Sequence, residues 1–334
     1  MRLTRREVVV PLKETFASNT GVITEVRQEV VELAWQGLTG YGTARGADPA
    51  ELDACAALLA DTSPYGLRRL LARLAVAGIG PATASAVDLA LHDLLGKACG
   101  QPLHRLFGLE GLAAPQTALS IGACSDEDLL AKGRELADWP ILKLKFTPED
   151  DGSRAGLLRS VYAGRIRVDG NGSWEPGQAL RVAEELHRHG VELLEQPVAP
   201  GRLDDLQWVH ERSPVPVWAD EDCTGPESVL ALRGRVRGVN LKLVKCGGLE
   251  RTREAITLAR AGGLEVMLGC KVESSLGVTA MAQLAPLADC LDLDGPVGLL
   301  TDPFDGLTID HGALTLPDTP GLGAAPNPMF YGED

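Results

Sequence analysis

Five charged residues recur along this chain at nearly constant intervals, each within or at the end of a short apolar segment. They are separated by 24, 26, 25 and 22 residues, and in chain order they are Lys145, Asp169, Glu195, Asp220 and Lys242. An interval of this length suits one β-strand followed by one helix. In barrels built from such units, the carboxyl ends of the strands form the active site. The spacing therefore predicts that these five side chains gather at one end of a barrel.

The three acidic residues of this series predict a metal site. Carboxylates brought together on consecutive strands repel one another unless a cation lies between them. An acidic residue at one strand end is often only a helix cap, but three in succession exceed what capping needs. Oxygen ligands favour a hard divalent cation, Mg²⁺ first and Mn²⁺ as the alternative. Asn171 and Glu221 follow two of these strands and are predicted to hold the ligands or a lysine in place.

The segment ILKLKF at residues 141–146 carries two lysines within an apolar strand pattern. Residues two apart in a strand point the same way, so Lys143 and Lys145 share one face. In an edge strand that face would meet water. The metal site predicted on the following strands instead favours the barrel interior. There, desolvation and the neighbouring ammonium both favour a neutral amine at Lys145, the form that acts as a base.

The order of the strands predicts where the lysines lie relative to the metal. Lys145 precedes the three acidic strands and Lys242 follows them, so a closed ring places the two amines on opposite sides of the ion. A substrate lying across the ion would lose a proton to one lysine and regain it from the other, which inverts a carbon centre. Lys245 is the rival second base, but it adjoins Gly247, whereas Lys242 lies within its strand.

From about residue 116 onward, short apolar segments alternate with longer amphipathic ones. Alternation of strands and helices indicates parallel βαβ units. The eight strand candidates are QTALSI, ILKLKF, RIRVDG, VELLEQP, VPVWAD, GVNLKL, LEVMLG and CLDLDG. Eight strands within about 180 residues favour a closed α/β barrel of the TIM type. A doubly wound sheet is the alternative, but no G-x-G-x-x-G follows an early strand.

The first third of the chain has a different pattern. Antiparallel strands are predicted at 3–12, 22–34 and 37–44, with a hairpin turning near Gln36-Gly37. Helices are predicted at 49–61, 64–75 and 81–100, the last between a proline and a glycine. This region predicts a small α+β unit.

Composition and charge exclude several classes of protein. The 334 residues are 45% hydrophobic and 23% charged, which is ordinary for a globular protein, and the net charge is −14. That charge argues against nucleic acid or an anionic membrane as a partner. The sequence has no apolar run of the ~20 residues that span a bilayer, and the charged N-terminal segment does not resemble a signal peptide. Seven cysteines without a C-x-x-C pair indicate a reducing compartment. We therefore expect a cytoplasmic protein of undetermined oligomeric state.

These motifs together resemble the enolase superfamily, and within it the muconate-lactonising-like subgroup. The matching segments are LKLKF, VDGN, LEQP, ADED and LKLVKCGG. The resemblance implies a modified (β/α)7β barrel at residues 116–315. It also implies an α+β capping domain at 1–115, to which the C-terminal segment 316–334 returns.

One further segment, CLDLDGPVGLL at residues 290–300, resembles the D-x-D signature of dipeptide epimerases. The resemblance implies that Asp292 and Asp294 bind the free α-ammonium of a dipeptide substrate, a role that suits paired carboxylates. The alternative is a solvated loop. The segment MLGCKVESSLG at 267–277 also resembles the epimerases, although Lys271 stands where methionine is common.

The resemblance implies the mechanism of a Mg²⁺-dependent dipeptide epimerase acting on an L-Ala-L-Xaa type of substrate. The metal on the three acids would chelate the C-terminal carboxylate and stabilise an enediolate. Lys145 and Lys242 would exchange the α-proton of the C-terminal residue, and Lys143 would tune Lys145 and contact the same carboxylate.

Rival functions stay open at this point. An N-acylamino acid racemase, o-succinylbenzoate synthase or cycloisomerase of the same superfamily would not need the D-x-D pair. A noncatalytic metal-dependent binding protein would not need two lysine bases. The segment TFASNTGVI at 15–23, where the family places a specificity loop, has no arginine of the kind that some Ala-Glu epimerases use, which leaves small or apolar side chains open.

Overall fold

The largest sheet of the protein has eight parallel strands that follow one another in chain order. The structure is a computed structural model and describes residues 1–19 and 21–331. The strands are β4 (Leu119–Ile121), β5 (Ile141–Lys145), β6 (Arg165–Asp169), β7 (Val191–Glu195), β8 (Val217–Ala219), β9 (Gly238–Leu241), β10 (Glu265–Gly269) and β11 (Cys290–Asp292). Each of them lies within one of the eight predicted segments.

The sheet closes on itself next to its first strand. Thr117 forms a parallel bridge with Leu291 of β11, and the amide of Ala118 donates to the carbonyl of Leu291 at 3.1 Å. The last strand therefore meets the segment that leads into β4. The predicted barrel is confirmed, and the doubly wound alternative is wrong.

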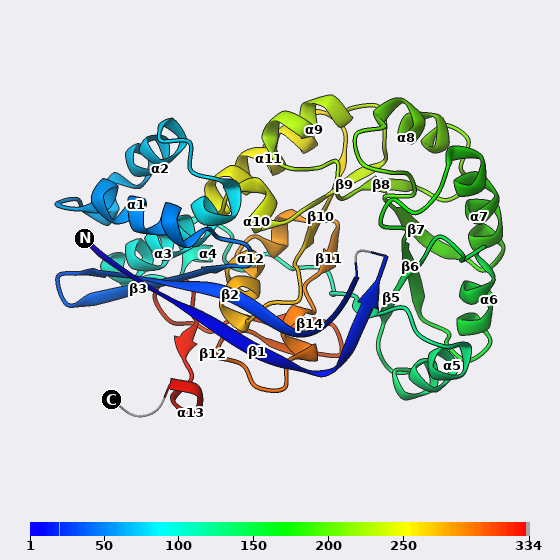
Figure 1. The fold of residues 1–334 in the computed structure, drawn as a ribbon, viewed down its shortest axis with the longest axis horizontal. Helices are drawn as coiled ribbons and strands as arrows, with labels where there is room; N and C mark the ends of the chain where they lie inside the picture. The colour runs from blue at the N-terminus through cyan, green and yellow to red at the C-terminus, as the bar shows by residue number, and fades with distance from the viewer. Residues whose placement is uncertain (20, 332–334) are drawn as a thin grey trace.

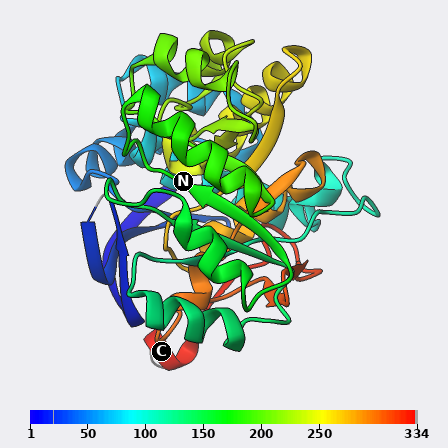
Figure 2. The same ribbon diagram turned by 90° about the vertical axis from the view of Figure 1, so that its right-hand side faces the viewer.

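Helices follow the strands and cover the outside of the barrel, as Figure 1 shows. They are α5 (Asp126–Glu135), α6 (Ser153–Arg159), α7 (Pro176–Arg188), α8 (Leu203–His210), α9 (Pro226–Leu232), α10 (Leu243–Cys246), α11 (Leu249–Ala261) and α12 (Ser275–Ala282). In α7 the buried residues are Ala179, Val182, Ala183 and Leu186, a spacing that forms one face of a helix. Figure 2 views this side, with the green helices of residues 150–210 in front of the strands.

The N-terminal region forms a cap beside the barrel. Its elements are β1 (Arg2–Ser18), β2 (Gly21–Trp35), β3 (Leu38–Ala44), α1 (Pro49–Leu59), α2 (Leu67–Val76), α3 (Pro81–Cys99) and α4 (Leu103–Leu106). The three strands pair antiparallel in chain order, and Gln36 and Gly37 turn the second hairpin with positive φ of 49° and 81°. Helix α3 lies so close to β3 that a Cβ on Gly42 would be 2.0 Å from the carbonyl oxygen of Ala86.

The chain after the barrel contains short elements and returns to the cap. They are β12 (Phe304–Asp305), β13 (Thr308–Asp310), β14 (Ala313–Thr315), β15 (Ala325–Pro326) and α13 (Pro328–Tyr331). The amide of Leu322 donates to Asp93 of α3 at 2.7 Å, and the amide of Leu103 donates to the carbonyl of Gly321 at 3.0 Å. The domain boundaries at 115 and 316 stay a prediction, and residues 332–334 of the returning segment lie outside the described residues.

The β1–β2 hairpin extends from the cap to the barrel (Figure 1). The carbonyl of Ala17 accepts from the amide of Ala123 at 2.8 Å, and Asn19 Nδ2 donates to the carbonyl of Asn171 at 3.2 Å. Its tip therefore lies at the end of the barrel where the acidic strands finish. Residue 20, part of the predicted specificity loop at 15–23, lies outside the described residues.

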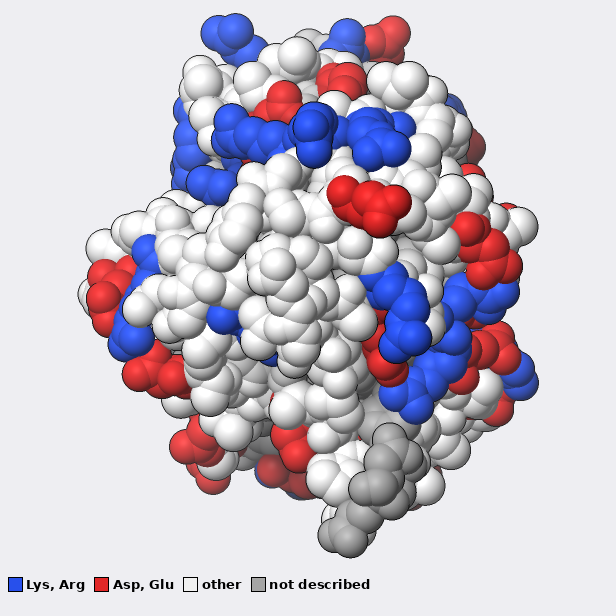
Figure 3. All heavy atoms as spheres, turned by 90° about the vertical axis from the view of Figure 1, so that its left-hand side faces the viewer, with Lys and Arg blue, Asp and Glu red and all other residues white. Residues whose placement is uncertain are grey.

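On the face formed by the cap, basic and acidic side chains lie in neighbouring groups around an uncharged central area (Figure 3). All seven cysteines are free. Among the described residues, no helix is both long enough and apolar enough to cross a bilayer.

Candidate active site

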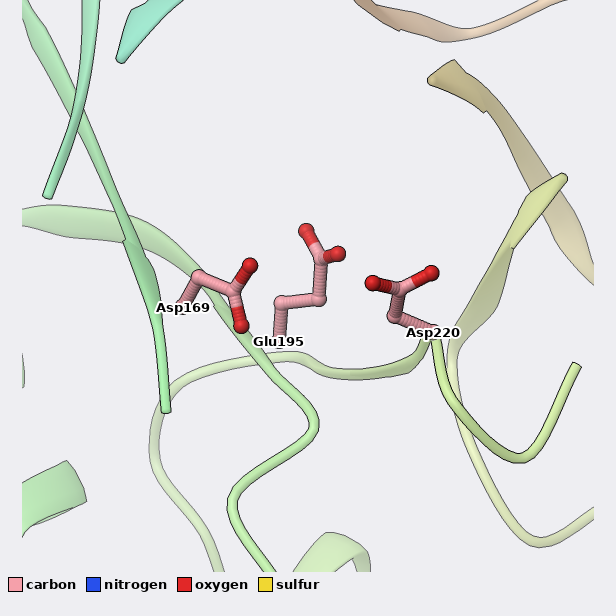
Figure 4. A group of neighbouring side chains, drawn as sticks. All are labelled: Asp169, Glu195 and Asp220. Carbon is pink, nitrogen blue, oxygen red and sulfur yellow. The ribbon is translucent and has the colours of Figure 1, made fainter. Parts of the chain in front are cut away.

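Three carboxylates lie side by side at the carboxyl ends of β6, β7 and β8. Asp169 ends β6, Glu195 ends β7, and Asp220 directly follows β8. Asp169 pairs with Glu195 in the parallel register, which sets their side chains at the same level. All three are buried, and each offers an oxygen within 4.8 Å of those of the others. Figure 4 shows them in a row, with Asp169 and Asp220 at its two ends.

The two lysines of β5 meet this row at Asp169. Lys145 Nζ lies 2.6 Å from Asp169 Oδ2, and Lys143 Nζ lies 3.4 Å from the same oxygen. Their predicted common face is therefore confirmed, and that face looks into the barrel. The alternative of a solvated edge strand is wrong, because β5 lies between β4 and β6 in the sheet.

Lys143 is fully buried and lies between acidic groups. Its Nζ is 2.7 Å from Glu195 Oε2 and 2.6 Å from Asp292 Oδ2. Burial acts to lower the pKa of Lys143, but Asp292, Glu195 and Asp169 outweigh it and raise the pKa well above its ordinary value. Lys143 is thus a permanent cation that links the metal-site carboxylates to Asp292.

Lys242 and Lys245 meet the other end of the row. Lys242 Nζ lies 2.7 Å from Asp220 Oδ2, and Lys245 Nζ lies 2.5 Å from Asp220 Oδ1. Lys245 also donates to the backbone carbonyls of Asp220 and Asn240, so its ammonium is more restrained than that of Lys242. This difference supports Lys242 as the second base.

At this end of the row, the pKa values of Asp220 and Lys242 shift in opposite directions. Burial raises the pKa of Asp220, but the ammonium groups of Lys242 and Lys245 outweigh it and hold the pKa well below its ordinary value. Burial lowers the pKa of Lys242, but Asp220 and Glu195 outweigh it and raise the pKa. In this state Asp220 is the ionised partner of a protonated Lys242.

The residues around the row fit a divalent cation. Burial raises the pKa of Glu195 to about 7. The nearby lysines therefore do not fully offset the cost of burying its negative charge. Among the described residues, no hydrogen-bond partner reaches the buried oxygens Asn171 Oδ1, Glu221 Oε2 and Asn240 Oδ1. Buried oxygens of this kind are usually satisfied by a ligand, an ion or water. With three carboxylates at its centre, the donor set matches what Mg²⁺ prefers.

Asn171 and Glu221 contact each other beside the metal ligands. Asn171 Nδ2 donates to Glu221 Oε1 at 3.1 Å, and the Asn171 amide donates to Asp169 Oδ1 at 2.9 Å. Asn171 adopts a positive φ of 43°, which brings its amide back toward the strand end. The two residues therefore lie where they were predicted to orient the ligands.

Asp292 and Asp294 lie across the barrel mouth from the metal ligands. Asp292 ends β11 and, besides its contact with Lys143, has a buried Oδ1 with no hydrogen-bond partner among the described residues. Asp294 Oδ2 accepts from the amide of Ser120 at 2.6 Å. Burial raises the pKa of Asp292, but Lys143 and Lys145 outweigh it and lower the pKa. An ionised oxygen at Asp292 is thus available to a cationic group.

Two buried residues that support the metal ligands were not predicted from the sequence. Asn240 Nδ2 donates to Glu195 Oε1 at 2.8 Å. Gln196 Oε1 accepts from the amide of Asp220 at 3.0 Å. A signal existed for Asn240, since it is a polar residue two positions before Lys242 and shares its face of the strand.

Two family models match most of the chain. Residues 2–108 match the mandelate racemase / muconate lactonizing enzyme N-terminal domain, and residues 127–329 match the enolase C-terminal domain-like family. The second match alone covers more than half of the chain. The protein therefore belongs to the enolase superfamily, in its mandelate racemase and muconate lactonizing branch, as the resemblance implied.

Individual relatives carry narrower names. An L-Ala-D/L-Glu epimerase of Bacteroides thetaiotaomicron is 35% identical over 338 residues, which cover 97% of this chain and 87% of that one. A hydrophobic dipeptide epimerase of Roseobacter litoralis is 35% identical over 262 residues, 74% of each chain. The crystal structure of a dipeptide epimerase from Enterococcus faecalis, complexed with Mg and the dipeptide L-Leu-L-Tyr, superposes with a TM-score of 0.91 and 28% identity, covering 97% of this chain and 99% of that chain.

Proposed function

We propose that this protein is a Mg²⁺-dependent dipeptide epimerase that inverts the α-carbon of the C-terminal residue by 1,1-proton transfer. One observation carries the proposal. Two lysines contact opposite ends of a row of three buried carboxylates, Lys145 at Asp169 and Lys242 at Asp220. The named epimerase relatives support it across nearly the full length of the chain.

The metal would be held by Asp169, Glu195 and Asp220, with Mn²⁺ as an alternative to Mg²⁺. When bound, the cation supplies positive charge that neutralises these carboxylates and the negative charge developing on the substrate carboxylate. Asp169 and Asp220 then stabilise the neighbouring ammonium groups less strongly, which lowers the pKa of Lys242 from its raised value toward the range of a base.

The chain's own residues then divide the reaction between two faces of the substrate. One of Lys145 and Lys242 takes the α-proton, and the other returns a proton to the opposite face, so the configuration inverts. Which lysine acts as base depends on the starting configuration. Lys143 remains charged and contributes a fixed positive charge beside the reacting carboxylate.

Asp292 and Asp294 favour a dipeptide over the other substrates of the branch. A free α-ammonium would meet the ionised Asp292, whose buried Oδ1 lacks a partner among the described residues. N-acylamino acids, o-succinylbenzoate precursors and muconate have no such ammonium and leave this oxygen unsatisfied. A noncatalytic binding protein would gain nothing from an amine at each end of the carboxylate row.

Deuterium incorporation tests the proposal. Incubation of the protein with Mg²⁺ and a library of L,L-dipeptides in D₂O should add one deuterium to the C-terminal α-carbon and yield the L,D product. A chelator should abolish both changes, and Mg²⁺ should restore them. Exchange only with N-acylamino acids would favour the racemase alternative, and exchange with no substrate would contradict the proposal.

A further inference from the structure

The two proposed bases differ in what holds their backbone. Lys145 is a paired residue of β5 and lies opposite Asp169 of β6 in the parallel register. Lys242 directly follows Leu241, where the pairing of β9 with β10 ends. Its carbonyl accepts from the amide of Lys245 at 3.0 Å, which begins the single turn of α10. The sheet therefore brings both lysines to the same end of the barrel, but the backbone of Lys242 continues directly into a short helical turn.

This turn packs into the hydrophobic core of the cap, although it follows a barrel strand. Val244 is buried in a cluster whose other buried members lie between residues 31 and 94, including Ala86 of α3. Its neighbour Leu243 belongs instead to the core of the barrel. The turn that follows Lys242 therefore lies between the two parts of the fold and contacts both.

An aspartate of the cap contacts the chain where this turn ends. Asp88 of α3 is fully buried, and its Oδ2 accepts from the backbone amide of Leu249 at 2.5 Å, across 161 positions of the sequence. The preceding residue, Gly248, has a positive φ of 111°, and a Cβ there would lie 2.4 Å from Asp88 Cγ. Glycine is needed at this position for both the backbone conformation and the close approach of the carboxyl group. Asp88 thus fixes the far end of the turn.

A buried histidine contacts Asp88 from the other side. His92 lies one turn further along α3, and its Nδ1 is 3.3 Å from Asp88 Oδ1. Burial lowers the pKa of His92, but the charge of Asp88 and its hydrogen bonds outweigh this and raise the pKa. A buried pair of this kind is often no more stable than an apolar pair of similar size. Since the amide of Leu249 is also the first of α11, capping of that helix is the purely structural explanation.

We propose that Asp88 is a positioning residue for the second base: it fixes the turn at residues 243–248 and thereby directs the amine of Lys242 toward the α-carbon of the substrate. This inference rests on the proposed epimerase function and adds a residue of the cap to it. Lys145 is held by strand pairing and does not depend on Asp88. A displacement of ~1 Å in a reacting group can cost about 100-fold in rate. A small shift of the turn should therefore slow proton transfer at one face of the substrate and not at the other.

Deuterium exchange at each face of the substrate tests this assignment. A lysine that removes the α-proton can return a deuteron from D₂O to the same face, which labels the recovered starting epimer without inversion. The L,L- and L,D-dipeptides are incubated separately with saturating Mg²⁺, and label in the recovered starting epimer is measured at early times. The epimer that still exchanges in Lys242→Ala is the one that faces Lys145. The two exchange rates are thereby assigned to the two lysines.

Two variants disturb the contact between Asp88 and the turn from opposite sides. In Asp88→Leu and in Gly248→Ala, exchange at the Lys242 face should fall about tenfold, while exchange at the Lys145 face stays within about twofold of wild type. Asp88→Asn keeps an oxygen that can accept from the amide of Leu249, so it should retain both rates. Gly248→Ala leaves the side chains of α3 intact and decides the question if Asp88→Leu fails to fold.

Asp93→Leu is the matched control on the same helix. Asp93 is also fully buried, but it accepts from the amides of Tyr41 and Leu322 at 2.8 and 2.7 Å. Its substitution should lower the thermal stability without changing the ratio of the two exchange rates.

A double variant separates positioning from a general structural role. In a Lys242→Ala background, Asp88→Leu should leave the remaining exchange unchanged, because a residue that acts through Lys242 has no further effect once that amine is removed. Equal losses at both faces, a further loss in this background, or unchanged rates in both Asp88→Leu and Gly248→Ala would overturn the inference alone. Absence of exchange with every dipeptide in the wild type would instead overturn the proposed function, and this inference with it.

Discussion

The two parts of the barrel mouth differ in how their charges are paired. At the ends of β5 to β9, each lysine has a carboxylate oxygen at 2.5–2.7 Å. Lys143 and Lys145 lie in β5, Lys242 directly follows β9, and Lys245 lies in the following helix α10. Elsewhere at the mouth, Lys271 follows β10 by two residues and Arg45 belongs to the cap. Sheet register fixes the first set relative to one another, whereas the second set depends on how the cap meets the barrel. In our proposal, the paired part of the mouth performs the chemistry.

Removing either proposed base should have the largest effect. In Lys145→Ala and Lys242→Ala, epimerisation should fall at least about 1000-fold, because each face of the α-carbon depends on one amine. Chiral chromatography measures inversion, and deuterium incorporation measures proton abstraction. A single-base variant should still exchange deuterium, at a reduced rate, into the one epimer that faces its remaining lysine.

Two further variants sharpen this result. Lys132→Ala removes a surface lysine and should be neutral. Lys245→Ala should cost less than Lys242→Ala, because Lys245 holds Asp220 and its backbone through several contacts without facing the substrate in our proposal. A larger loss in Lys245→Ala would transfer the role of second base to it, and near-normal turnover in both base variants would end the two-base assignment.

The next effect concerns the ammonium site. Asp292→Asn should lower the specificity constant for free dipeptides about 100-fold, because a neutral amide replaces a charge-assisted partner. N-acetylated dipeptides lack the ammonium and serve as matched substrates, whose already low rates should change far less. Since Asp292 also contacts Lys143 at 2.6 Å, thermal unfolding of the variant is measured alongside. Equal losses with both substrate types would indicate that Asp292 acts through Lys143 rather than on the ammonium.

The buried Glu273, whose Oε1 accepts from the amide of Lys271 at 3.2 Å, should make stability depend on pH. Its pKa is raised from 4.5 to about 7 in the folded state, so folding is favoured while the group is protonated, and this contribution is lost as pH rises between these values. In Glu273→Gln that loss is absent. The stability of the variant relative to wild type should therefore increase by about 2 kcal/mol between pH 5.5 and pH 8.5. Urea unfolding at both pH values, with Mg²⁺ present, measures it, and a constant difference would contradict the shift.

The sequence predicted the strand ends well because the relevant pattern is local. A two-residue period sets Lys143 and Lys145 on one face, and a repeat of one strand and one helix carries Asp169, Glu195 and Asp220 to one end of the barrel. The structure bears out all eight strands and this convergence. The helices of the cap were also recognisable, since proline and glycine mark the ends of α3.

Contacts between distant parts of the chain were not predictable in the same way. Lys143 meets Asp292 across 149 positions, and Arg45 meets Val272 across 227. No local period relates such residues, because barrel closure and the docking of the cap bring them together. The contact of Arg45 with the segment that carries Lys271 therefore emerged only from the three-dimensional structure.

Asn240 combines a local strand pattern with a contact to a residue on another strand, and its substitution has the smallest predicted effect. Its place in β9, two residues before Lys242, directs it inward, and its Nδ2 donates to Glu195 Oε1 at 2.8 Å. Asn240→Leu keeps a similar volume but removes this donor, so Glu195 loses the contact that orients it. We expect Mg²⁺ to bind about tenfold more weakly, as is typical when a partner of a metal ligand is removed.

Calorimetric titration with Mg²⁺ measures this change directly, and thermal unfolding without metal separates it from a general loss of stability. Asn327→Leu is the matched control, because Asn327 donates to the carbonyl of Asp302 in the chain after the barrel, and it should leave Mg²⁺ binding unchanged. Equal affinities in Asn240→Leu and wild type would mean that sheet register alone positions Glu195. In that case the paired part of the mouth would owe its geometry to the backbone and not to the side chains between its ligands.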